Sequence, residues 1–91
     1  MKKSVRIYVS GNVQGVFFRN FVKENAEKLN VNGFVRNLED RRVEAFFEGN
    51  SDDVNKIIEI CKKGPKHADI KGIQLKEETF QNLKNFKILH I

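Results

Sequence analysis

Residues 11–19, Gly-Asn-Val-Gln-Gly-Val-Phe-Phe-Arg, combine two glycines with an arginine at the start of an amphipathic segment. A helix begins with about four backbone N–H groups that lack partners, and a Ser, Thr, Asp or Asn side chain usually caps them. No such side chain immediately precedes the helical pattern here. Because glycines let the backbone curl so that N–H groups converge, we expect an anion site in this loop. The expected donors are the backbone amides of Val13, Gln14, Gly15, Val16, Phe17 and Phe18.

Arg19 falls in the first turn of that expected helix. A cation at the positive end of the helix dipole costs a few tenths of a kcal/mol to about 1 kcal/mol, unless an anion lies between them. A guanidinium can donate two parallel hydrogen bonds to phosphate, and each charge-assisted bond contributes roughly 1.5–3 kcal/mol. An isolated arginine is ordinarily a solvated surface residue. Beside an uncapped glycine loop, it indicates phosphate binding instead.

Other chemistries find little support in the sequence. The loop matches neither GxxxxGK[ST], because Val16 stands where a lysine is needed, nor GxGxxG. His67 and His90 are far apart and are expected on a loop and a strand surface, so we expect no metal and no cofactor. Cys61 lies on an apolar helical stripe, which favours a buried, inert thiol. The adjacent Glu39 and Asp40 are typical of solvated turn residues.

Hydrophobic spacing predicts the elements that hold this loop. Residues 4–10 alternate with period two and indicate a strand, whereas the residues after 18 follow a helical stripe formed by Phe18, Phe21, Val22, Ala26 and Leu29. Residues 31–37 and 43–48 resemble two strands joined by a polar turn. A second helical stripe consists of Val54, Ile57, Ile58 and Cys61; Ser51 is the expected cap, and Gly64-Pro65 ends the helix. Residues 69–76 and 84–90 are expected to close the sheet.

The order strand, helix, strand, strand, helix, strand is typical of the split βαβ arrangement, with two helices on one face of an antiparallel sheet of four to five strands. This topology places the loop after Ser10 near the region around Asn37. Gly33, Val35 and Asn37 share one side of their strand, which we expect the helices to cover. Asn37 is then directed toward the start of the first helix, although asparagine is equally a common turn residue.

Length and composition set the limits on function. Ninety-one residues, 40% hydrophobic and 32% charged, predict a single domain spanning residues 1–91. The net charge of +5 favours an anionic partner: nucleic acid, a phosphorylated metabolite or an acidic surface. No apolar run reaches the roughly 18 residues of a membrane span, so we expect no membrane association. One cysteine excludes an internal disulfide, and a cytoplasmic monomer is the expected form.

Two segments resemble the signature motifs of the acylphosphatase family: GNVQGVFFR at 11–19 and GFVRN at 33–37. The resemblance continues through VEAFFEG at 43–49 and GPKHADI at 64–70. It implies a ferredoxin-like fold and metal-independent hydrolysis of an acyl phosphate, a small molecule, to a carboxylate and inorganic phosphate. It also implies that Arg19 binds the phosphoryl group and that Asn37 orients the attacking water. The hairpin departs from the family pattern, because Asp40-Arg41 replaces the usual Asp-Gly.

Two alternatives belong to other classes of protein. A basic ferredoxin-like module could bind RNA by stacking bases on Tyr8, Phe34 and Phe46 on the open sheet face. However, the second hairpin strand carries glutamates where phosphates would approach, so no nucleic acid partner is expected. A regulatory domain that keeps the phosphate loop without turnover is the other alternative, since a fold alone does not fix function.

Overall fold

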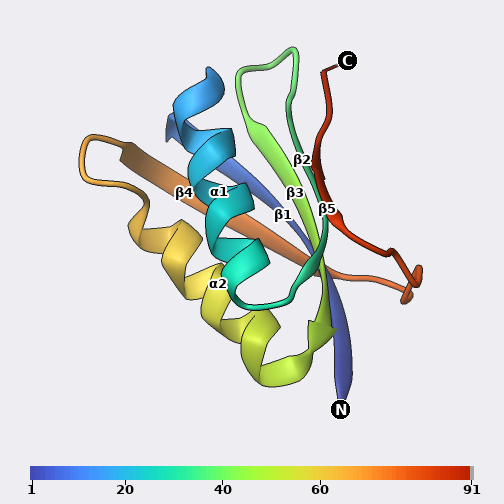
Figure 1. The fold of residues 1–91 in the computed structure, drawn as a ribbon. Helices are drawn as coiled ribbons and strands as arrows, with labels where there is room; N and C mark the ends of the chain where they lie inside the picture. Colours follow the sequence, from blue (N-terminus) through green and yellow to red (C-terminus); the bar gives the residue numbers. More distant parts are fainter. Residues whose placement is uncertain (91) are drawn as a thin grey trace.

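The computed structural model describes residues 1–90, which form five strands and two helices (Figure 1). In chain order they are β1 (Lys2–Asn12), α1 (Val16–Lys28), β2 (Asn32–Asn37), β3 (Val43–Asn50), α2 (Ser51–Lys63), β4 (Asp69–Glu77) and β5 (Phe86–Ile88). Both helices cover one face of a single sheet, with strand order β4-β1-β3-β2-β5. This arrangement confirms the ferredoxin-like α+β fold. Neither helix is long and apolar enough to cross a membrane.

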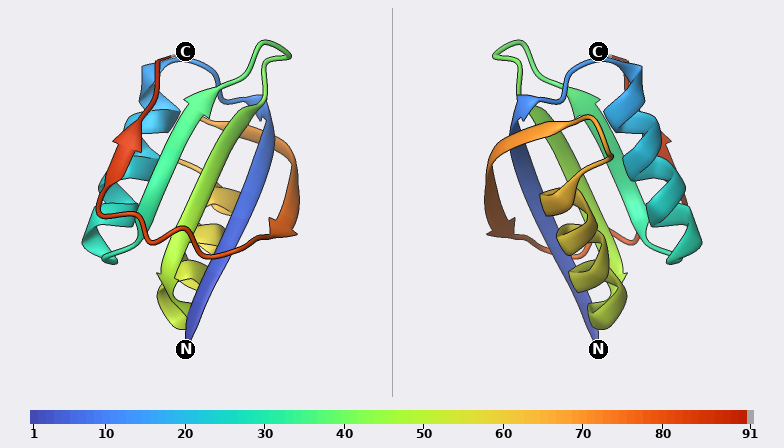
Figure 2. Two further views of the ribbon diagram at one scale, coloured as in Figure 1. Left: turned by 90° about the vertical axis from the view of Figure 1, so that its right-hand side faces the viewer. Right: turned by 90° about the vertical axis from the view of Figure 1, so that its left-hand side faces the viewer.

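The predicted antiparallel sheet is confirmed for four strands, but the fifth strand makes the sheet mixed. β4, β1, β3 and β2 pair antiparallel, but β5 pairs parallel with β2. The reason is the connection from β4 to β5, which crosses the uncovered face of the sheet before β5 begins (Figure 2). After this crossing, β5 starts at the same end as β2 and runs beside it. The final strand is also shorter than the predicted 84–90.

The core lies between the sheet and the helices. The buried hydrophobic residues of β1 are Val5, Ile7 and Val9, which confirms the period-two prediction. The predicted stripe of α1 contributes Phe18, Val22 and Ala26, and that of α2 contributes Val54, Ile57, Ile58 and Cys61.

The N-terminal cap of α2 differs from the prediction. Its cap is Asn50, whose side chain accepts a hydrogen bond from the backbone N–H of Asp52 at 3.0 Å, so Ser51 is the first helical residue instead.

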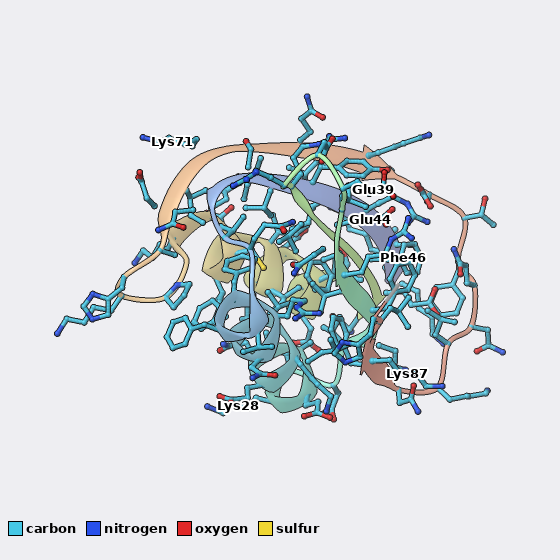
Figure 3. All side chains as sticks on the ribbon, turned by 90° about the horizontal axis from the view of Figure 1, so that it is seen from above. Lys28, Glu39, Glu44, Phe46, Lys71 and Lys87 are labelled. Atoms are coloured by element: carbon cyan, nitrogen blue, oxygen red, sulfur yellow. The ribbon has the colours of Figure 1, made fainter. Side chains whose placement is uncertain are left out.

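The opposite face of the sheet is packed by the protein's own side chains. The rings of Phe34 and Phe46 stack with centroids 5.8 Å apart, and the Arg6 guanidinium lies over both. Figure 3 shows Glu44 and Phe46 on the side of the sheet away from the helices. The buried Glu48 carboxylate accepts hydrogen bonds from backbone N–H groups of the crossing segment. Phe46 is therefore fully covered and unavailable for stacking on a base.

Burial raises the pKa of the Cys61 thiol to about 12, against an ordinary value near 9. The folded chain therefore keeps this proton at pH values where the unfolded chain loses it. We expect the free energy of unfolding to fall as pH rises from about 9, by up to about 1.4 kcal/mol per pH unit from this group. Denaturant titrations of wild type and Cys61→Ala at pH values between about 8 and 10.5 give the free energy of unfolding of each protein and its slope against pH. Equal slopes for the two proteins would contradict the prediction.

Candidate active site

The start of α1 is uncapped. Gly15 occupies the N-cap position with φ 102° and ψ −176°, no side chain accepts a hydrogen bond from this end, and the first turn contains no acidic residue. A Cβ atom added to Gly15 would meet nothing within 4 Å. Glycine is therefore required by its positive φ and not by lack of space, because other residues rarely adopt this conformation. The expectation of an uncapped helix start is borne out by this geometry.

The other glycine of the motif has a different role from the one predicted. Gly11 lies within β1, at an irregularity in its pairing with β4, and a Cβ there would lie 2.1 Å from the backbone oxygen of Asp69. It permits close strand contact and is not part of the curled loop. The loop is thus confined to residues 13–15. Within residues 1–90, none of the hydrogen bonds found outside the regular elements has a backbone N–H of residues 13–18 as its donor.

The loop side chains divide into anchors and exposed groups. Val13 and Phe18 are buried in the core and fix the two ends of the segment. Val16 and Phe17 are 61% and 63% exposed and lie at the first turn of α1. Because the apolar side chains cannot hydrogen-bond a phosphate, any phosphate contact by these four residues must come from their backbone N–H groups.

Gln14 ties the loop to the turn between β2 and β3. Its side-chain amide donates to the backbone oxygens of Leu38 at 3.1 Å and Arg42 at 3.0 Å. The loop is therefore fixed beside the end of β2, as the topology predicted. Figure 1 shows the start of α1, the β2–β3 turn and the segment after β5 at the same end of the molecule.

Asn37, the last residue of β2, carries an unsatisfied acceptor. Its Oδ1 is buried and has no hydrogen-bond partner among the described residues. Leaving a buried acceptor unpaired costs roughly 1–3 kcal/mol. The backbone oxygen of the next residue, Leu38, accepts a hydrogen bond from Gln14, so Asn37 ends β2 where that strand meets the loop preceding α1. An unpaired amide oxygen at this place is suited to accept a hydrogen bond from a small molecule such as water.

Arg19 is a buried cation without a carboxylate partner in residues 1–90. Its side chain is turned back toward the start of the helix, where Nε donates to the backbone oxygen of Gly15 at 3.0 Å. The residue is 8% exposed, and no Asp or Glu in the described chain forms an ion pair with it. Burying an ion costs several kcal/mol unless it is paired. A buried guanidinium beside uncapped helix amides is an arrangement that favours a negatively charged group.

His90 also contacts this cluster. It is exposed, as predicted, but it lies beyond the end of β5 and not on a strand. Its Nδ1 lies 3.4 Å from Nη1 of Arg19. No local sequence signal indicates this contact, because it depends on the parallel pairing of β5 with β2, which was not predicted from the sequence.

The hairpin turn forms without the glycine that the family pattern led us to expect. Arg41 adopts φ 75°, the left-handed conformation that glycine adopts readily. Asp40 stabilises the turn, because its carboxylate accepts from the backbone N–H and from Nε of Arg42 at 3.1 and 2.8 Å. These contacts lower the pKa of Asp40. The turn therefore supplies the two carbonyl groups that bind Gln14 despite the substitution.

The geometry defines a class of protein: a ferredoxin-like domain with an uncapped first helix, a buried arginine in the first turn of that helix and an unpaired carboxamide oxygen at the end of β2. Residues 1–90 contain no cluster of three His, Cys, Asp or Glu side chains that could hold a metal ion.

The family is identified by comparison with known proteins. The acylphosphatase family model matches residues 5–88. An acylphosphatase of Rubrobacter xylanophilus is 54% identical over 84% of this chain and 69% of its own, and one of Syntrophus aciditrophicus is 47% identical over 99% and 95%. The crystal structure of acylphosphatase from Bacillus subtilis superposes with a TM-score of 0.92 at 34% identity, covering 99% and 100% of the two chains.

The chain belongs to the acylphosphatase family. It is accordingly a hydrolase, with small acyl phosphates as substrates and inorganic phosphate as a product.

The contact of Gln14 with the turn can be tested by substitution. Gln14→Ala removes the donor to two backbone oxygens and releases the loop, so we expect kcat/KM for an acyl phosphate to fall roughly tenfold and stability to fall by about 1 kcal/mol. Gln14→Glu should be at least as severe, because its carboxylate faces those oxygens and repels the substrate. Gln81→Ala, an exposed glutamine on another segment, is the matched control. Wild-type kinetics in both Gln14 variants would contradict the assigned contact.

Proposed function

We propose that the uncapped start of α1 binds the phosphoryl group of the acyl phosphate and that Asn37 orients the water that attacks it. Backbone amides of residues 13–18 and the guanidinium of Arg19 would hold the phosphoryl oxygens. The observation that carries the proposal is the burial of Arg19 beside an uncapped helix end, with no carboxylate partner in residues 1–90. A phosphoryl dianion supplies the missing negative charge and accepts hydrogen bonds from both groups.

The reaction needs few catalytic groups because its leaving group is stable. Water attacks phosphorus, the P–O bond to the acyl group breaks, and its electron pair leaves on a carboxylate. The conjugate acid of that carboxylate has a pKa of about 4, so no general acid is required near neutral pH. The transition state is loose and carries its charge on the equatorial oxygens, which fixed donors can stabilise.

Asn37 contributes by orientation and not as a base. Its Oδ1, which has no partner in the described chain, is free to accept a hydrogen bond from the attacking water. A carboxamide is too weakly basic to take the proton, and its NH₂ group can only donate. The proton of the attacking water therefore passes to a phosphoryl oxygen, so that the products are a carboxylate and inorganic phosphate.

The proposal extends to the form of the protein in the cell. We place it in the cytoplasm as a monomer formed by one domain over residues 1–91. Support comes from the single, buried cysteine, which suits a reducing compartment, and from the net charge of +5, which opposes self-association. Among the alternatives, RNA binding is disfavoured by the covered Phe46 and by the Arg42 guanidinium lying over the Tyr8 ring.

Substitution at the two proposed residues tests the site. We expect Arg19→Ala and Asn37→Ala each to lose roughly two to three orders of magnitude in kcat/KM with a simple acyl phosphate, as when one transition-state donor is deleted. Arg19→Lys should be only partly active, since lysine lacks the two-pronged donor geometry. Phosphate release is measured with and without a chelator, which should have no effect.

The exposed Asn20→Ala is the matched control and should behave as wild type. Turnover in water labelled with a heavy oxygen isotope should place the label in phosphate and not in the carboxylate. Wild-type rates in either site variant would remove the assignment. A wild-type protein that binds phosphate but does not turn over would support the regulatory alternative.

Inorganic phosphate should inhibit competitively, because as product it occupies the same amides and guanidinium. The two site residues should respond differently. Arg19→Ala should raise the inhibition constant of phosphate by about tenfold or more, since a charge-assisted contact to the ion is lost. Asn37→Ala should leave that constant near the wild-type value, because Asn37 binds the water. Residual activity of each variant at several phosphate concentrations gives the constant, and a noncompetitive pattern would refute a shared site.

A further inference from the structure

The tail after β5 brings a third side chain to the site. β5 runs parallel to β2 with Phe86 beside Gly33 and Ile88 beside Val35, and the backbone N–H of Leu89 donates to the oxygen of Val35 at 2.9 Å. β5 ends at Ile88, and His90 lies two residues beyond it. The exposed His90 residue reaches Arg19 in the first turn of α1, as its side-chain contact with Arg19 shows.

The contact between His90 and Arg19 has one chemically consistent form. Arginine has only N–H donors and is not deprotonated in proteins. At the 3.4 Å contact, Nη1 of Arg19 must therefore be the donor and Nδ1 of His90 the acceptor. The imidazole is then neutral, with its proton on Nε2. A protonated ring would place two cations together.

Among residues 1–90, this contact leaves most donors of the guanidinium without an acceptor. Of the five N–H donors, the one on Nε is used by the Gly15 oxygen and one on Nη1 by His90. Three remain, two on Nη2 and one on Nη1, and they suffice for a two-pronged bond to phosphoryl oxygens. The Gly15 oxygen accepts from Nε and His90 Nδ1 accepts from Nη1. These two separate acceptors fix both the position and the rotation of the guanidinium plane.

We infer that His90 is a positioning residue, which accepts a hydrogen bond from Arg19 and orients its guanidinium for the phosphoryl group. The inference rests on the proposed function of Arg19 in phosphate binding. It adds a residue from the C-terminal tail, 71 positions away in the chain, to the acyl phosphate site. Because the oriented group binds substrate and product phosphate alike, the contribution of His90 belongs to binding in both complexes.

The test compares His90→Ala with His90→Asn, whose carboxamide oxygen can replace Nδ1 as the acceptor. For His90→Ala we expect KM for a simple acyl phosphate and the inhibition constant of phosphate to rise together, by roughly fivefold, with kcat within about twofold of wild type. His90→Asn should restore both constants to within about twofold. In the Arg19→Ala background, His90→Ala should have no further effect, since the group that it orients is absent.

His67→Ala, the same substitution at an exposed histidine elsewhere, is the matched control, and the thermal unfolding midpoint of each variant is recorded. A purely structural role would move the midpoint and would persist without Arg19. The inference fails if His90→Ala equals wild type, if His90→Asn is as impaired as His90→Ala, or if the effect is undiminished without Arg19. If the wild-type protein did not hydrolyse the acyl phosphate, or if Arg19→Ala had wild-type kinetics, the proposed function would be refuted instead.

Discussion

The burial of one guanidinium among uncapped amides is the constraint on which the site depends. Arg19 is held in the first turn of α1 by its bond to the oxygen of Gly15, where the helix dipole opposes a cation. Local sequence preferences do not favour this arrangement, and no carboxylate of residues 1–90 compensates for it. The surrounding fold must therefore maintain it. The anchors Val13 and Phe18 do so from the core, and Gln14 does so from the neighbouring turn.

On the sheet face away from the helices, the arginines form ion pairs with glutamates. Arg6 binds the carboxylates of Glu44 and Glu78 at 2.6 Å, which raises the pKa of Arg6 and lowers that of Glu78. Arg36 adds a second cation to Glu44. The contrast with Arg19 is physical: the Arg6 guanidinium already has its anions, whereas the Arg19 guanidinium has donors without an acceptor among residues 1–90. An external phosphate can gain charge-assisted bonds only from the second.

Much of this could be predicted from the sequence, because the relevant signals are local. Alternation in β1, the helical stripes and the missing cap before α1 depend on near neighbours, and the structure agrees with each. The errors concern long-range geometry. The parallel pairing of β5, the closeness of Gly11 to Asp69 and the contact of His90 with Arg19 all depend on how distant segments meet. No residue pattern near them specifies that meeting.

The chemistry of acyl phosphate hydrolysis explains why the proposed site can consist of groups from only three segments: the loop with the start of α1, the end of β2 and the tail after β5. An acyl phosphate carries its own good leaving group, so the enzyme needs neither a general acid nor a strong base, only donors and an oriented water. Those groups must be held to within a fraction of an ångström, which a loop alone does not achieve. Here the loop is tied to a strand end through Gln14, and the guanidinium is held from the helix and from the tail. The split βαβ topology brings these segments to one end of the sheet, so the fold and the proposed site share the same long-range contacts.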